Sequence, residues 1–128
     1  MPVKHVRPTK LELRVLGALW QTGGGTVRDI HEVLDKEESI GYTTVLKMLQ
    51  IMTDKGLAQR DESVRPFVYR TRHSQERTQD HLLSDLVHRA FGGSVKALVV
   101  RALAVSKSSK KDLKAIEQML DKFDRKKK

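Results

Sequence analysis

"GYTTVLKMLQIMTDKG", residues 41–56, has the pattern of a helix with an unusual surface. Two hydroxyl residues, Thr43 and Thr44, open it, and no acidic residue occurs between 39 and 53. Because a helix N-terminus carries about half a positive charge, an end without carboxylates is open to an anion such as phosphate. Apolar residues recur at helical spacing and predict one buried face; they are Val45, Met48, Leu49 and Met52.

The segments before this stretch predict two further helices. "TKLELRVLGALW", residues 9–20, begins with Thr9 and carries Glu12 three residues later, which is a capping-box pattern. The "TGGG" run at 22–25 ends this helix, because glycine tolerates the left-handed backbone of a helix end. Thr26 then opens a second helix.

After Gly56 the apolar period changes from helical to extended. "LAQRDE" at 57–62 and "RPFVYRTR" at 65–72 are short β-capable runs around a polar turn, and they predict a two-stranded hairpin. Three helices followed by a hairpin match a winged helix-turn-helix, in which the third helix enters a DNA groove.

From Ser74 the pattern is helical again, with predicted helices over 74–91, 94–105 and 109–123. We therefore predict a mainly α fold with a small β-wing. A winged helix-turn-helix DNA-binding domain would occupy residues 1–73, and a helical dimerisation domain with a basic tail would occupy 74–128.

The composition favours a polyanionic partner. The 128 residues carry a formal net charge of +9, which points toward nucleic acid or an anionic membrane surface. There is no cysteine, so disulfides and thiolate metal sites are excluded. The N-terminus lacks a signal peptide and no stretch is long enough for a membrane span. These features predict a soluble cytoplasmic protein with no membrane insertion.

Duplex DNA is the partner that the pattern favours. The hydroxyls of Thr43 and Thr44 can donate to phosphate or to base edges, and Lys47, one turn later, can reach a guanine edge or the backbone. An ordinary surface helix with few acids is the alternative, and the hairpin and the basic balance count against it. Further residues are placed to contact phosphate; they are Thr9, Lys10, Lys55, Arg60, Arg65 and Arg70.

Several motifs together resemble the penicillinase-repressor family (the BlaI/MecI/CopY type) over about residues 8–123. The most specific is "TTVLKMLQIMTDKG" at 43–56, supported by "TKLELRVLGALW" before it and "FGGSVKALV" at 91–99. The resemblance implies a dimeric bacterial transcriptional repressor on a palindromic operator. It also implies base contacts by Thr43, Thr44 and Lys47. Leu46 stands where a polar residue is common, which implies a contact with a thymine methyl.

The helices after residue 74 could fold back as a monomeric cap or pair with a second chain. A helix as apolar as "VKALVVRALAV" at 95–105 needs burial on more than one side, and the resemblance favours a homodimer. The predicted dimer interface comprises Leu82, Leu83, Leu86, Val87, Phe91, Leu98, Val99, Leu103, Ile116 and Leu120.

The resemblance also implies release of repression by a membrane sensor protease that cuts the second of these helices. Aligning "ALVV" places the bond at Arg101–Ala102, where relatives have Asn-Phe. The alternative is that 97–105 is dimer core, and the apolar helical spacing favours it.

The remaining patterns carry weaker hypotheses. His81, Asp85 and His88 could share a zinc or nickel ion, although a solvated helix face is the commoner explanation. For His31 and His73 the sequence indicates no partner. No catalytic signature, cofactor or small-molecule substrate is implied. The competing function is a winged-helix adaptor that binds protein without specific DNA binding.

Overall fold

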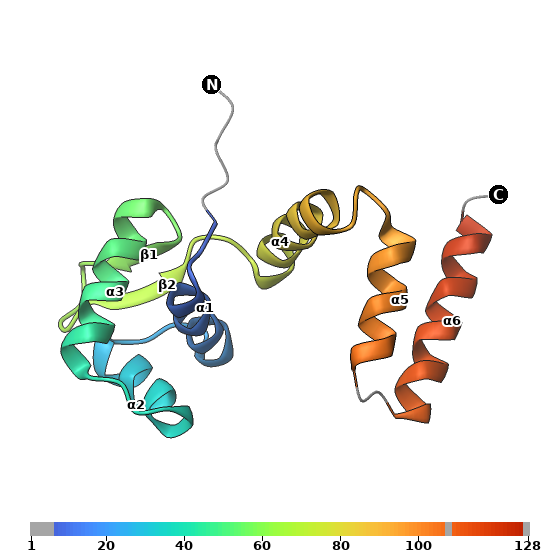
Figure 1. Ribbon diagram of the computed structural model, residues 1–128. Helices are drawn as coiled ribbons and strands as arrows, with labels where there is room; N and C mark the ends of the chain where they lie inside the picture. Colours follow the sequence, from blue (N-terminus) through green and yellow to red (C-terminus); the bar gives the residue numbers. More distant parts are fainter. Residues whose placement is uncertain (1–6, 107–108, 127–128) are drawn as a thin grey trace. The chain divides into compact units, whose positions relative to one another are not determined.

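The computed structural model describes residues 7–106 and 109–126, and its elements follow the predicted order (Figure 1). The prediction of a mainly α chain with a small β-wing is confirmed. The last two lysines of the basic tail lie outside the described residues. The elements are α1 Lys10–Thr22, α2 Val27–Glu37, α3 Tyr42–Lys55, β1 Ala58–Asp61, β2 Val68–Thr71, α4 Gln75–Ala90, α5 Val95–Val105 and α6 Lys110–Lys126.

Both α1 and α2 begin with a complete capping box, which was predicted for α1. The Thr9 hydroxyl accepts a hydrogen bond from the Glu12 N–H at 3.1 Å, and Glu12 Oε1 accepts one from the Thr9 N–H at 2.8 Å. Thr26 and Asp29 repeat the arrangement at 3.2 and 3.0 Å. These exchanges satisfy amide groups that a helix start otherwise leaves unpaired.

The third helix begins differently. Its N-cap is Gly41, which has no side chain to offer, and no side-chain cap is present. The helix starts at Tyr42, one residue before the predicted pair of threonines. Its first turn contains no acid. Of the three helices of this part of the chain, α3 alone starts with open amide groups.

The wing is an antiparallel pair with register from Ala58↔Thr71 to Asp61↔Val68. A further pairing was not predicted: Gly25 donates to the Tyr69 carbonyl at 3.0 Å and accepts from the Tyr69 N–H at 2.8 Å. The loop after α1 therefore extends the ladder and ties the wing to the helices.

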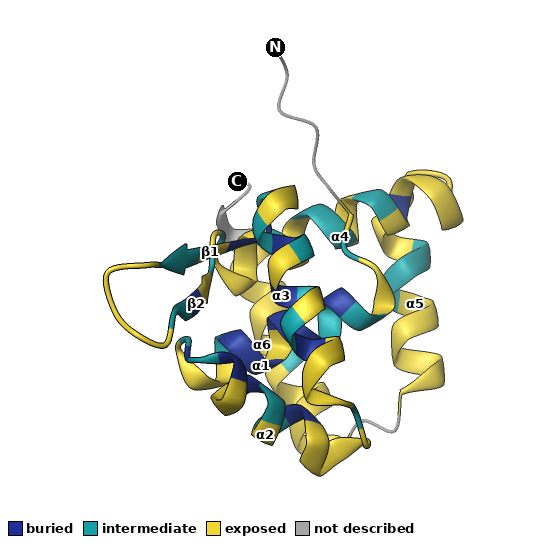
Figure 2. Ribbon diagram, turned by 90° about the vertical axis from the view of Figure 1, so that its left-hand side faces the viewer, coloured by how far each residue is buried: buried dark blue, intermediate teal, exposed yellow. Residues whose placement is uncertain are grey.

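The core lies among α1, α2, α3 and the wing, where Figure 2 shows the buried segments. Glu12 is the one charged side chain that is buried among the described residues. Of the face of α3 that was predicted to be buried, Met48 is only half-buried. The core comprises Val15, Leu16, Ala18, Leu19, Val27, Ile30, Leu34, Val45, Leu49, Met52, Leu57, Ala58 and Tyr69.

The chain divides into two compact units, Met1–Leu83 and Ser84–Lys128. The division falls inside α4, later than the predicted boundary at residue 73, which stays a prediction. The Trp20 indole N–H donates to the His73 carbonyl at 3.4 Å and ties the chain after the wing to α1. No helix of the described chain is long and apolar enough to cross a membrane.

Candidate nucleic-acid interface

The outer face of α3 presents the predicted base-reading residues to solvent. Thr43, Thr44 and Lys47 are exposed, and Leu46 is half-buried. These residues lie in the first two turns, next to the open amide end of the helix. The only acid of α3, Asp54, lies in its last turn. The end of α3 that carries positive charge is therefore also the end that carries the hydroxyls and the lysine.

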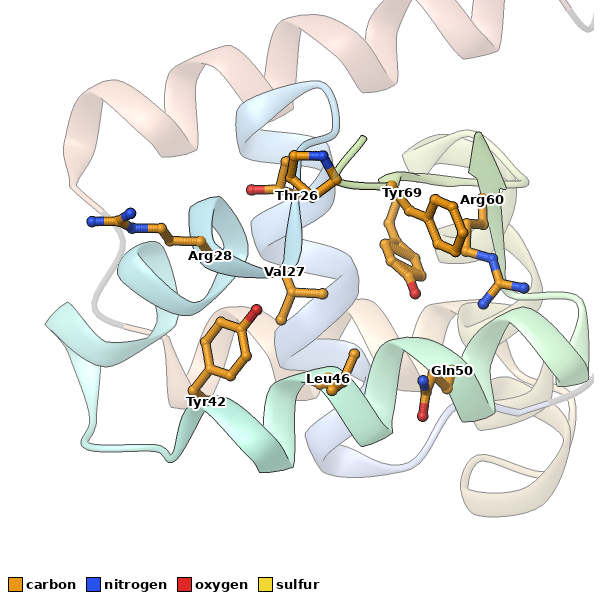
Figure 3. A pocket seen from close by; sticks show the side chains of 10 residues that line it. Thr26, Val27, Arg28, Tyr42, Leu46, Gln50, Arg60 and Tyr69 are labelled. Carbon is orange, nitrogen blue, oxygen red and sulfur yellow. The ribbon is translucent and has the colours of Figure 1, made fainter. Parts of the chain in front are cut away.

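A cleft of about 310 Å³ lies between the start of α2, α3 and the wing. Figure 3 shows Tyr42 and Leu46 rising from α3 into it, with Tyr69 opposite and Arg28 extending outward. The sequence prediction missed Tyr42 and Arg28 as neighbours of the site. The signal was present, because Tyr42, Leu46 and Gln50 are spaced four apart and share one face of a helix. The lining residues are Thr26, Val27, Arg28, Tyr42, Leu46, Gln50, Arg60, Pro66, Phe67 and Tyr69.

Two arginines of the wing are held against one aromatic ring. The guanidinium carbons of Arg60 and Arg65 lie 5.0 and 4.5 Å from the centroid of the Phe67 ring, within cation–π range. Arg60 is also paired with Glu62 at 2.7 Å. Arg65 donates to the carbonyls of Glu62 and Val64 and stays exposed. Within the described part of the chain no ion pair is seen for Arg65, whereas the charge of Arg60 is partly neutralised by Glu62.

The electrostatics of the wing follow from these contacts. The side chain of Tyr69 and the Glu62 carboxylate raise the pKa of Arg60 above its ordinary value. The hydroxyl and backbone N–H of Ser63 lower the pKa of Asp61, whose Oδ1 accepts from them at 2.5 and 2.9 Å. Both shifts favour the charged forms of Arg60 and Asp61. Arg70 is exposed on β2.

Lys55 has another partner than the predicted phosphate. Its ammonium lies 3.0 Å from Oε2 and 3.3 Å from Oε1 of the buried Glu12. Burial is the largest influence on Glu12 and opposes its ionisation, but the Thr9 N–H and Lys55 together outweigh it and lower the pKa of Glu12 below its ordinary value of 4.5. The charge of Lys55 is therefore matched within the chain, and its contact with phosphate stays a prediction that competes with this ion pair. Lys10 remains exposed at the start of α1.

The contacts of His31 differ from the prediction, and the surroundings of His81 and His88 bear on the hypothesis of a metal site. His31 was predicted to lack a partner, yet its Nε2 lies 2.8 Å from the Ile40 carbonyl and its ring meets Tyr42 edge-on at 5.8 Å between centroids. On α4, His88 Nδ1 lies 2.8 Å from the Ser84 carbonyl. No group of three His, Asp or Glu side chains in the described chain is placed to hold a metal ion, so the trio His81, Asp85 and His88 carries no metal site here.

Within one copy only one of the ten predicted dimer residues is buried. Val87 is buried, whereas Arg101 and Ala102 at the predicted cut are exposed in α5. The half-buried residues are Leu82, Phe91, Leu98, Val99 and Ile116, and the exposed ones are Leu83, Leu86, Leu103 and Leu120.

The chain is similar to known regulators. Residues 8–122 match the family model described as penicillinase repressor. The chain is 32% identical over 99 residues to the transcriptional regulator BlaI of two Mycobacterium tuberculosis strains, CDC 1551 / Oshkosh and ATCC 25618 / H37Rv. This match covers 76% of the chain and 72% of each relative.

The solved structures that resemble the chain include two of low sequence identity. A MarR family protein from Bacillus stearothermophilus has a TM-score of 0.48 at 16% identity, covering 98% of this chain and 76% of that one. A MarR family transcriptional regulator from Silicibacter pomeroyi DSS has a TM-score of 0.45 at 18% identity, covering 92% and 71%.

Proposed function

The chain belongs to the penicillinase repressor family, and on that premise we propose that it is a dimeric repressor that binds a palindromic operator in duplex DNA through α3 and the wing. The observation that carries the proposal is the start of α3. It is uncapped and free of acids, and it exposes Thr43, Thr44 and Lys47. Tyr42, the first residue of α3, lines the same cleft as Arg60 of the wing.

In the proposed complex α3 enters the major groove. The hydroxyls of Thr43 and Thr44 and the ammonium of Lys47 hydrogen-bond to base edges, and Leu46 contacts a thymine methyl. The amide groups at the start of α3 face a phosphate, where the helix dipole and the unpaired donors act together.

Contacts to the DNA backbone fix the position of the protein without reading sequence. Arg65 and Arg70 are exposed on the wing and would lie along the neighbouring strand. Arg60 contributes less, because Glu62 is already paired with it. Thr9 and Lys10 at the start of α1 complete the set.

The second unit supports a dimer because it has almost no core of its own. Val87 is the only buried residue described after residue 83. A stable unit requires apolar burial, and a second copy supplies it with a two-fold axis that also sets two α3 helices about 34 Å apart. The large apolar side chains left exposed in this unit are Leu86, Val95, Val100, Leu103, Val105, Leu113, Met119, Leu120 and Phe123.

Repression would be released by proteolysis of α5. A sensor protease cutting at Arg101–Ala102 would split α5 and remove the apolar surface that holds the dimer. Both residues are exposed in one copy, but dimer core is the competing role of this segment. Incubation of the protein with a sensor protease encoded beside its gene, followed by mass spectrometry, decides between them: an intact chain excludes this route.

Gel-shift assays with genomic fragments test the DNA-binding function. We expect specific retardation that weakens steeply with salt, with a log–log slope near −7 if a dimer neutralises about 8 phosphates. Lys47→Ala should weaken it, whereas Lys36→Ala, which removes an exposed lysine from the last turn of α2, should not. Indifference to DNA at low salt would instead support the adaptor, and the operator proposal would be abandoned. This protein would act in the cytoplasm, where the operator is accessible.

A further inference from the structure

The turn that leads into α3 is held by two side chains of α2. The Ile40 N–H donates to Asp35 Oδ1 at 3.2 Å, and the Ile40 carbonyl lies 2.8 Å from His31 Nε2. His31 and Asp35 are four residues apart and therefore share one face of α2. Both backbone polar groups of Ile40 are thus bonded to the same helix face.

The chemistry of the two contacts fixes their direction. A carbonyl can only accept, so His31 Nε2 carries the proton and donates to Ile40. The His31 ring also meets the Tyr42 ring edge-on, with an interplanar angle of 72°. The Ile40 side chain packs against the core. The residues on both sides of Gly41 are therefore anchored, although Gly41 itself offers no side chain.

We propose that His31 and Asp35 form a clasp that positions α3 for DNA binding, an inference that rests on the proposed function. A side-chain cap would orient the helix start but would also occupy the amide groups that the complex needs. Thr9 and Thr26 do this for α1 and α2. The clasp orients α3 from one residue earlier and leaves those groups open. His31 and Asp35 are positioning residues, because they act through Ile40.

The clasp determines the fraction of unbound molecules in which α3 is in its binding conformation. If the turn is released, α3 is correctly placed in only a fraction of molecules, and the apparent affinity falls by that fraction. Loss of one hydrogen bond of ordinary strength should therefore weaken binding by about 2- to 10-fold. The loss should be largest on a sequence that α3 reads, because binding to other DNA depends mainly on charge.

Matched pairs of variants separate the hydrogen bonds from other effects. Asp35→Ala and Asp35→Asn remove the same charge, but Asn keeps an oxygen that can accept from Ile40. His31→Ala removes the donor, whereas His31→Gln places an amide N–H the same number of bonds from the backbone. Lys36→Ala is the control for an exposed neighbour on α2.

Two measurements on the full chain test the clasp. The first is amide hydrogen exchange at residues 40–44, with Leu16 and Leu49 as core references. The second is affinity for a duplex that the wild-type chain enriches from a random-sequence library, compared with the same duplex after its centre is scrambled.

We expect both alanine variants to exchange faster at 40–44, with Leu16 and Leu49 unchanged. They should bind the enriched duplex about 2- to 10-fold more weakly and the scrambled duplex as before, and His31→Gln and Asp35→Asn should recover most of the loss. Unchanged exchange at 40–44 overturns the clasp, as does equal loss on both duplexes. If His31→Ala fails to fold, the Asp35 pair still decides. If the wild-type chain enriches no duplex, the proposed function fails, and the positioning role fails with it whatever the exchange shows.

Discussion

Removing either partner of the ion pair between Glu12 and Lys55 should destabilise the protein, but by different amounts. Glu12 is 1% exposed and Lys55 is 38% exposed. Lys55→Met should therefore cost more stability than Glu12→Gln. The first change leaves a buried carboxylate without its counter-charge, whereas the second leaves an ammonium that can turn into water.

The magnitudes follow from the contacts. In Glu12→Gln the side-chain oxygen can still accept from the Thr9 N–H, so only the charged contact is lost. A hydrogen bond to a charged group contributes about 1.5–3 kcal/mol. Because Lys55 is partly exposed, Glu12→Gln should lower the free energy of unfolding by about 1.5 kcal/mol. Lys55→Met should cost about 3 kcal/mol, the lower end for a broken buried pair. The double variant should be about as stable as Glu12→Gln alone, because no buried charge remains.

Urea unfolding at fixed protein concentration, followed by fluorescence of the single tryptophan, Trp20, measures these free energies. The pKa of Glu12 is lowered in the folded chain, so its contribution is present above the ordinary value of 4.5 and is lost as the pH falls through the folded value. The difference between wild type and Glu12→Gln should shrink accordingly in acid. Equal costs for the two single variants, or strictly additive losses, would refute the reasoning. In salt titrations of DNA binding, Lys55→Met should leave the slope unchanged, whereas a phosphate contact would reduce it by about 1.

Three further predictions concern other parts of the chain. Lys47→Ala should cost about 1–3 kcal/mol of operator binding and relax preference at one base pair per half-site; in gel shifts, a uniform loss on all duplexes would show that Lys47 touches only phosphate. Leu98→Asp should break the dimer in sedimentation experiments and reduce operator affinity far more than non-specific affinity, while Lys96→Ala on the same helix should do neither; a Leu98→Asp dimer would contradict our account of α5. Gly24→Ala should destabilise by more than about 1 kcal/mol, because its φ is 109° and a Cβ would lie 2.8 Å from the Tyr69 carbonyl oxygen. Gly17→Ala, where a Cβ meets open space, should instead stabilise by about 0.5–1 kcal/mol. Thermal unfolding that ranks the two glycine variants the other way would count against the loop–wing pairing.

The helices and the wing could be predicted because their signals are local. The capping boxes at Thr9 and Thr26 lie within four residues of sequence, and the change of apolar period after Gly56 marks the hairpin directly. Helical spacing also indicated that Thr43 and Lys47 would be exposed. These features depend on the backbone geometry of one element and need no knowledge of its neighbours.

The contacts that refine the site lie beyond any local pattern. Lys55 is 43 residues from Glu12 in the sequence. Helical spacing therefore indicated on which side of α3 Lys55 lies, but not which residue it contacts. The pairing of Gly25 with Tyr69 joins the loop after α1 to a strand. The sequence predicted only that the glycines at 23–25 end a helix, and gave no sign that one of them pairs with the wing. His31 bonds to a backbone carbonyl, which leaves no trace in side-chain composition.

The pairing of Gly25 with Tyr69 also bears on which lengths of chain can change. The ladder anchors the base of the wing to the loop after α1, whereas its tip at 62–66 is exposed. Exposed tips tolerate insertions, and bonded backbone does not. A longer or shorter tip should therefore change the proposed reach along the DNA backbone without moving α3.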